Sequence, residues 1–106
     1  MISIVNLYFN YWNQHSTKDL RNLFDNSVVL EDWENKFVGV EEVIQENKNI
    51  FENFPNINAT IIDLGISDKI AYAKIKVFLD SKNEIDVVDT FDFKENKITG
   101  IKAYKG

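Results

Sequence analysis

The acidic residue with the most informative surroundings is Asp89, which lies in a run of strongly β-forming residues. Side chains alternate between the two faces of a strand, so residues two apart share a face. Asp89 therefore shares its face with four apolar side chains, those of Ile85, Val87, Phe91 and Phe93. A carboxylate there must find a partner or bind a proton, because an unpaired buried charge is very costly. When protonated, it can act as a hydrogen-bond donor.

The partner of Asp89 on the following strand depends on the turn that joins the two strands. A two-residue turn at Glu95-Asn96 places Asp89 opposite Lys102, which predicts an ordinary cross-strand ion pair. A three-residue turn at Lys94–Asn96 places Asp89 opposite Ile101 and leaves it without a cation. Asparagine tolerates the left-handed conformation that ends such a three-residue turn. The residues alone favour the unpaired acid and leave the ion pair open.

Two further residues have side chains suited to acid–base chemistry. Asp32 ends an expected strand, on the face that it shares with Val28 and Leu30. Taken alone, an acid at a strand end is more often simply solvated. Tyr11 lies one helical step from Tyr8 on the buried side of the first expected helix, where a core tyrosine with a satisfied hydroxyl is the commoner case.

The elements that must position these residues divide the chain into two halves. The first half has helical periodicity, with one expected strand from Val28 to about Trp33. The expected helices cover residues 3–14, Ser16 or Thr17 to Phe24, and the segment from Gly39 to Pro55. The second half has strand periodicity over residues 57–66, 70–79, 84–93 and 97–105, separated by short polar turns. This order predicts an α+β fold in which helices pack on one face of a curved antiparallel sheet.

Composition excludes several classes of function. The 106 residues suit a single domain, 1–106, and contain no cysteine and one histidine, which rules out thiol chemistry and any site that needs two histidines. A net charge of −5 with a single arginine argues against nucleic acid or an anionic membrane as a partner. No group of residues has the spacing of metal ligands, and we expect no cofactor. Without a targeting signal or a spanning segment, the protein is expected to be soluble and cytoplasmic.

The remaining polar residues have ordinary structural interpretations. The acids of the third expected helix are interpreted as a solvated helix face; they are Glu41, Glu42, Glu46 and Glu52. His15, at the break between the first two helices, is expected to be a surface residue.

Several segments together resemble one superfamily. They are Tyr11–Leu20, Leu23-Phe24, Val28–Asp32, Phe37–Gly39 and the alternating run Asp89–Phe93. In this order they resemble the nuclear transport factor 2-like superfamily, and more narrowly its SnoaL-like and ketosteroid isomerase branch. The resemblance spans the whole chain, although each motif alone is loose. It implies a cystatin-like, cone-shaped barrel: a strongly curved antiparallel sheet wrapped around three helices, enclosing an apolar pocket.

The resemblance also implies roles for three residues. Asp32, eight residues after Phe24, matches the general base of the steroid isomerases. Tyr11 matches the first hydrogen-bond donor to the substrate carbonyl, and Asp89 the second, a protonated acid. The family pattern favours the register that places Asp89 opposite Ile101. The implied activity is removal of a proton next to a carbonyl by an isomerase- or cyclase-type enzyme.

The expected ligand is a small apolar carbonyl compound held in the pocket. Its expected contacts are Tyr8, Trp33, Phe51, Phe54, Val87, Phe91 and Ile101. The chain is short for the family, and Trp33 follows the expected base where a small residue is common, so a pocket smaller than a steroid is expected. The alternative function is a non-catalytic ligand-binding or dimerisation domain of the same fold.

The outer face of the expected sheet predicts self-association. Val88, Thr90, Ile98 and Gly100 are assigned to that face, which is too apolar to be fully solvated. Relatives commonly pair this way, so the protein is expected to be a homodimer.

Overall fold

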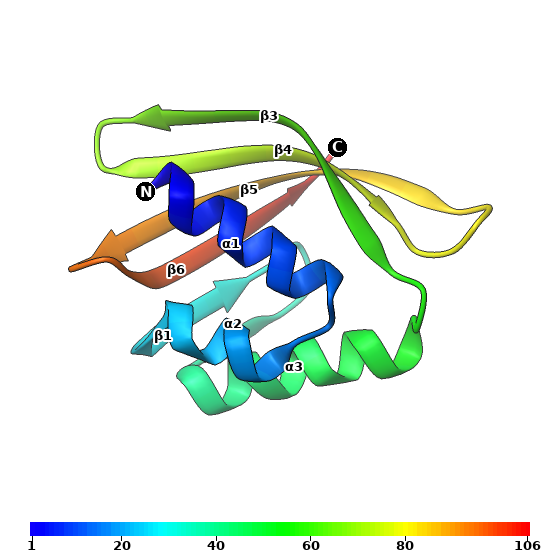
Figure 1. Ribbon diagram of the computed structural model, residues 1–106, viewed down its shortest axis with the longest axis horizontal. Coiled ribbons are helices and arrows are strands. Elements are labelled where there is room, and N and C mark those ends of the chain that lie inside the picture. The colour runs from blue at the N-terminus through cyan, green and yellow to red at the C-terminus, as the bar shows by residue number, and fades with distance from the viewer.

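The computed structural model describes all 106 residues as three helices and one six-stranded sheet (Figure 1). The elements in chain order are α1 (Ile2–Asn13), α2 (Thr17–Leu23), β1 (Phe24–Glu31), β2 (Lys36–Val38), α3 (Val40–Asn53), β3 (Asn58–Ser67), β4 (Ile70–Phe78), β5 (Glu84–Lys94) and β6 (Lys97–Lys105). The strand order is β2-β1-β6-β5-β4-β3.

The α+β class is confirmed. The sheet is mixed rather than wholly antiparallel, because β1 and β6 run parallel, and it is open, with β2 and β3 at its edges.

Local signals place the helix ends close to where the sequence predicts them. Ser16 caps α2 and accepts a hydrogen bond from the Asp19 amide at 3.3 Å. Gly39 precedes α3 with a φ of 90°, which glycine adopts without strain, and Glu41 and Glu42 occupy the first turn, where acids suit the helix dipole. Phe24 differs from the expectation: its backbone is extended, so it ends α2 and begins β1.

The helices cover one face of the sheet. Figure 1 shows α1 lying across the central strands, while α2 and α3 lie together beside β1. The buried side chains of α1 are Val5, Tyr8, Phe9 and Trp12. Rings from α1 and the sheet meet edge to face: Tyr8 and Phe9 each contact Phe91, with ring centroids 5.4 and 6.0 Å apart. These contacts fix the position of α1 over the sheet.

Polar side chains join the end of α1 to its neighbours. Asn13 donates to the carbonyl of Ala59 at 2.9 Å and accepts from the Ala59 amide at 2.7 Å, as a paired strand would. His15, expected at the surface, is half-buried: its Nε2 donates to the Ile57 carbonyl at 2.8 Å and its ring stacks on Phe51 at 4.3 Å. Its role here is structural.

The β5–β6 hairpin has a register that neither turn length predicts by itself. Glu95 and Asn96 form a two-residue turn with φ values of 51° and 67°, as a type I′ turn requires. Phe93 then pairs with Ile98 and Asp92 with Gly100, so Thr99 is the extra residue of a β-bulge.

The bulge moves every later partner by one residue. Asp89 therefore pairs with Ala103, and both expected registers are wrong. Lys102 pairs with Thr90 on the other face, so the predicted ion pair is not formed. The assignment of Ile98 to the outer face is also wrong, because the two-residue turn pairs it with Phe93 on the inner face, where it is fully buried.

Candidate functional site

A cavity of about 250 Å³ lies between the sheet and helices α1 and α3. Twenty residues line it, and 16 of them are hydrophobic. The four others are Asp32, Glu46, Asn47 and Asp89. An apolar hollow with a few polar groups is the usual form of a small-molecule site, so these four residues and Tyr8 define the chemistry available here.

Asp89 lines the cavity and is buried, with 8% of its surface exposed. Its strand neighbours are Ala73 on β4 and Ala103 on β6, whose methyl groups offer no hydrogen bond. The carboxyl group forms neither a hydrogen bond nor an ion pair within the chain. Burial raises the pKa of Asp89 to about 7, so near neutral pH a large fraction is protonated and can donate to a ligand.

Tyr8 lines the same cavity from α1 and is 5% exposed. Burial, and then the negative charge of Asp89, raise the pKa of Tyr8 far above its ordinary value. Tyr8 therefore keeps its proton and remains a donor at any physiological pH. We call Tyr8 and Asp89 the closed end of the cavity.

Asp32 follows directly after β1 and is half-buried. Its Oδ1 accepts hydrogen bonds from the amides of Glu34 and Asn35, both at 2.7 Å, which closes the loop between β1 and β2. Its Oδ2 accepts no hydrogen bond from the chain. Asp32 is thus held in place through one oxygen while the other is free to take a proton.

The strand register relates the two aspartates. Glu31 pairs with Lys102, so Asp32 stands level with Ala103, which is the partner of Asp89. The two acids therefore lie on either side of Ala103, two strand spacings or roughly 10 Å apart at the backbone. All three residues line the cavity, so the two carboxyl groups belong to the same ligand space.

Glu46 also lines the cavity, contrary to its interpretation as part of a solvated helix face. It is half-buried, and burial and then the charge of Asp32 raise its pKa. The signal was present in the sequence, because Glu46 lies three residues after Val43 and four before Ile50 on the apolar stripe of α3. Trp33, which is 45% exposed, lines the cavity beside Asp32. We call Asp32, Trp33 and Glu46 the open end.

The fourth polar residue, Asn47, is occupied by structural contacts. Its Oδ1 accepts from Trp12 Nε1 at 3.1 Å, and its Nδ2 donates to the carbonyl of Val43 at 2.9 Å. The first of these bonds ties α1 to α3 at the cavity wall, and the second lies within α3. Asn47 therefore uses its Oδ1 and one of its two Nδ2–H donors to hold the cavity wall in place.

The structure brings together most of the predicted site residues. Those that line the cavity are Asp32, Asp89, Tyr8, Trp33, Phe54, Val87 and Ile101. Tyr11 does not line it and packs at the margin of the core, so the tyrosine presented to the cavity is Tyr8. Phe51 and Phe91 lie behind the wall: Phe51 is covered by Trp12 and His15, and Phe91 is fully buried beneath Tyr8 and Phe9.

Comparison with protein families identifies the fold. Residues 5–101 match the model of the SnoaL-like domain, and the chain belongs to that family. No curated protein matches the sequence. The family and the neighbouring folds confirm the resemblance inferred from the sequence. The helices of the chain are all too short or too polar to cross a membrane.

Solved structures with similar folds share little sequence with this chain. A proposed polyketide cyclase from Sinorhizobium meliloti has a TM-score of 0.88 at 20% identity, over 95% of this chain and 93% of that one. A cystatin-fold protein from Novosphingobium aromaticivorans has a TM-score of 0.88 at 14% identity, over 96% and 95%. A protein of ketosteroid isomerase-like fold from Catenulispora acidiphila, solved in complex with trimethylamine, has a TM-score of 0.84 at 14% identity, over 95% and 83%.

Proposed function

We propose that the protein is a small acid–base enzyme, of the ketosteroid isomerase or polyketide cyclase type, that moves a proton next to a carbonyl group. The observation that supports this most strongly is Asp89: a buried carboxyl group without a partner, in the same cavity as the donor Tyr8 and the base Asp32. No fully buried side-chain oxygen of the chain lacks a hydrogen-bond partner, so the unbonded carboxyl oxygens of Asp89 are accessible from the cavity and available to a ligand there.

The roles follow from the environment of each group. The substrate carbonyl oxygen accepts hydrogen bonds from the Tyr8 hydroxyl and from protonated Asp89 at the closed end. Asp32 Oδ2 removes a proton from the neighbouring carbon, and the developing enolate is stabilised by the two donors. Asp32 then returns the proton to the enolate, at the same carbon or at a conjugated one. Ketosteroid isomerase is known to use a neutral aspartic acid in this way, and the proposal extends that logic to this cavity.

Cavity size limits the substrate. A cavity of roughly 150 Å³ is known to hold benzene, so one of about 250 Å³ suits a body of one or two rings. A four-ring steroid exceeds this volume. The substrate class is therefore a monocyclic or bicyclic ketone or enone.

The test is exchange of the α-protons of cyclohexenone and tetralone with deuterated solvent, followed by proton NMR. We expect the wild-type protein to accelerate exchange and Tyr8→Phe to lower the rate by roughly a hundredfold to a thousandfold, as loss of one enolate donor does. Tyr11→Phe is the matched control, since that hydroxyl lies outside the cavity, and should leave the rate unchanged. Equal rates for wild type and Tyr8→Phe would exclude Tyr8 as a donor. Failure to accelerate exchange of either ketone would favour ligand binding without turnover.

A further inference from the structure

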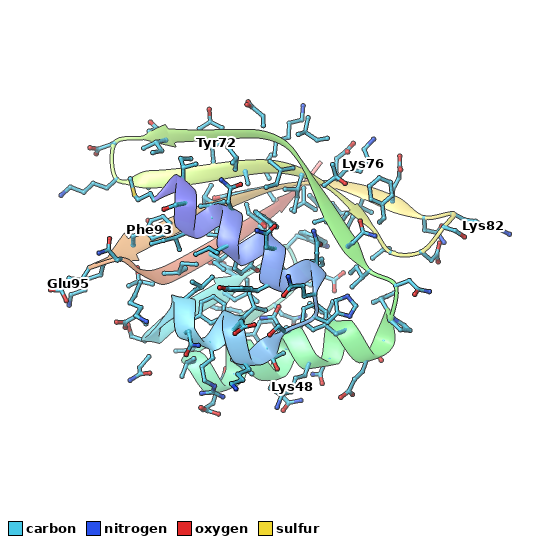
Figure 2. All side chains as sticks on the ribbon, viewed as in Figure 1. Lys48, Tyr72, Lys76, Lys82, Phe93 and Glu95 are labelled. Carbon is cyan, nitrogen blue, oxygen red and sulfur yellow. The ribbon has the colours of Figure 1, made fainter.

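The charged residue types in the cavity wall are all acidic. Three carboxyl groups line it, those of Asp32, Glu46 and Asp89, and no lysine, arginine or histidine does. The chain has 12 lysines and arginines, so this absence is not due to a shortage of cations. Figure 2 shows the labelled lysines, Lys48, Lys76 and Lys82, on the outside of the molecule. An anionic ligand such as a carboxylate or a phosphate would therefore find no cation in the cavity and would be repelled by the carboxylates of Asp32 and Glu46.

The two acids at the open end are not neutralised by the protein. The ion pairs of the chain join Arg21 to Glu41 and Lys76 to Glu84 and Asp86, all on the surface. Asp32 and Glu46 have no such partner, although they are close enough for the charge of Asp32 to raise the pKa of Glu46. Two neighbouring carboxylates without a cation form a site of strongly negative potential.

The ring of Trp33 adds to the preference of the open end for a cation. Trp33 lies at the open end with 45% of its surface exposed, and aromatic faces attract cations. The Nζ of Lys105 lies 5.7 Å from the Trp33 ring centroid, so the ring already has a cation beside it. Lys105 does not line the cavity and pairs with neither acid, which leaves the cavity side of the site without a positive charge.

A second, independent feature indicates that this cavity receives a ligand. Asp89 is more than nine-tenths buried, lines the same cavity and has no protein partner. Its hydrogen-bonding capacity is therefore available only to a molecule inside the cavity. The carboxylates at the open end thus lack a cation, and Asp89 at the closed end lacks a hydrogen-bond partner. A bound ligand can supply both.

We infer that the natural ligand is an amine: a body of one or two rings with a protonated amino group held at the open end by Glu46, together with Asp32 and Trp33. Glu46 is the residue that distinguishes amine binding from catalysis, because Asp32 Oδ1 is engaged by two amides and its Oδ2 is the base of the proposed function. This inference rests on the proposed function for the carbonyl group at the closed end, whereas the amine preference rests on the wall charge, the Trp33 ring and the unpartnered Asp89 and does not require turnover. The substrate class becomes an aminoketone rather than a neutral ketone.

The experiment compares three probes that share one apolar body: 3-phenylpropylamine, 3-phenylpropanol and 3-phenylpropanoate. Trp12 and Trp33 are the only tryptophans of the chain and both line the cavity, so intrinsic fluorescence reports binding directly. We expect the amine to bind roughly tenfold to a hundredfold more tightly than the alcohol, as charge-assisted hydrogen bonds allow, and the carboxylate not to bind. Glu46→Gln should remove most of the amine's advantage and leave the alcohol unchanged.

Glu52→Gln provides the matched control, because it makes the same change of charge on α3 at an exposed position outside the cavity. It should leave all three affinities unaltered. Equal binding of amine and alcohol, loss of amine binding in both variants, or no binding of any probe would each overturn the inference. Proton exchange of a neutral ketone by Glu46→Gln is measured separately. If exchange is absent while the amine preference remains, the proposed function fails and the inference of an amine ligand stands.

Discussion

The two ends of the cavity place the same functional group in opposite surroundings. At the closed end one carboxyl group, Asp89, is surrounded by alanine methyl groups and hydrophobic side chains, and burial raises its pKa to about 7. At the open end Asp32 is half-buried and accepts two backbone hydrogen bonds, with Glu46 beside it. In the proposed mechanism, environment rather than residue type therefore distinguishes the acid that donates a hydrogen bond from the one that accepts a proton.

The largest expected effect comes from removing the base at the open end. Asp32→Asn should lower turnover of an exchanging ketone by roughly a hundredfold to ten-thousandfold, because the amide cannot accept the substrate proton. The melting temperature should barely change, since the Asn side-chain oxygen can keep both loop hydrogen bonds. Steady-state kinetics and thermal melts measure the two effects. If Asp32→Asn kept full activity, Glu46 would become the candidate base.

The next prediction tests the closed end through stability. The pKa of Asp89 in the folded state, about 7, lies above its ordinary value of 3.8. Between these two pH values the folded protein holds a proton that the unfolded chain releases, so stability falls as pH rises from about 4 to about 7. The separation corresponds to at most roughly 4 kcal/mol. Asp89→Leu should abolish this loss and be more stable than wild type at pH 7.

Chemical denaturation of both proteins at several pH values measures the difference. The gap between Asp89→Leu and wild type should widen from pH 4 to pH 7. Asp92→Leu is the matched control on the outer face of the same strand and should show no such widening, because that acid is exposed. An Asp89→Leu protein less stable than wild type at pH 7 would mean that the ionised carboxylate has a stabilising partner.

Of the changes considered, disruption of self-association is expected to alter ligand binding least. We propose a homodimer through the outer sheet face, where Val88 and Thr90 are half-buried and Tyr104 is 49% exposed. That face is opposite the cavity, so dimerisation leaves the open end accessible. Sedimentation should give twice the 12.4 kDa chain mass, and Tyr104→Glu should halve it without altering amine affinity. A monomeric wild-type protein, or a dimer broken by Trp33→Glu instead, would contradict this arrangement.

Periodicity in the sequence predicted most of the fold and the character of Asp89. Alternation placed Asp89 on the apolar face of β5, and the apolar stripe of α3 was evident. The short strand β2 was not predicted, because three residues contain too little periodic signal. The turn could be proposed but the bulge at Thr99 could not, since a bulge depends on packing of the whole sheet.

The remaining differences between sequence and structure concern which way a side chain points, not which helix or strand it belongs to. Tyr8 and Tyr11 both lie on the inner side of α1, and only the docking angle of the helix decides which one reaches the cavity. Glu46 was classed with the exposed acids by its type, although its spacing placed it on the apolar stripe. Polar residues at functional sites depart from the pattern of their surroundings, so the position of Glu46 on the apolar stripe indicates its place in the cavity better than its residue type does.

Because of the bulge, the two strands of the β5–β6 hairpin differ in how well they tolerate the loss of a residue. Thr99 is the extra residue of the β-bulge on β6. Its deletion would restore regular β5–β6 pairing with Asp89 still opposite Ala103. Loss of Asp92 from the facing strand, with the bulge kept, would instead bring Asp89 opposite Lys102 and turn it away from the cavity. Lineages can therefore shorten β6 at this point and keep the site, whereas the same shortening of β5 would exchange an isolated acid for an ordinary surface ion pair.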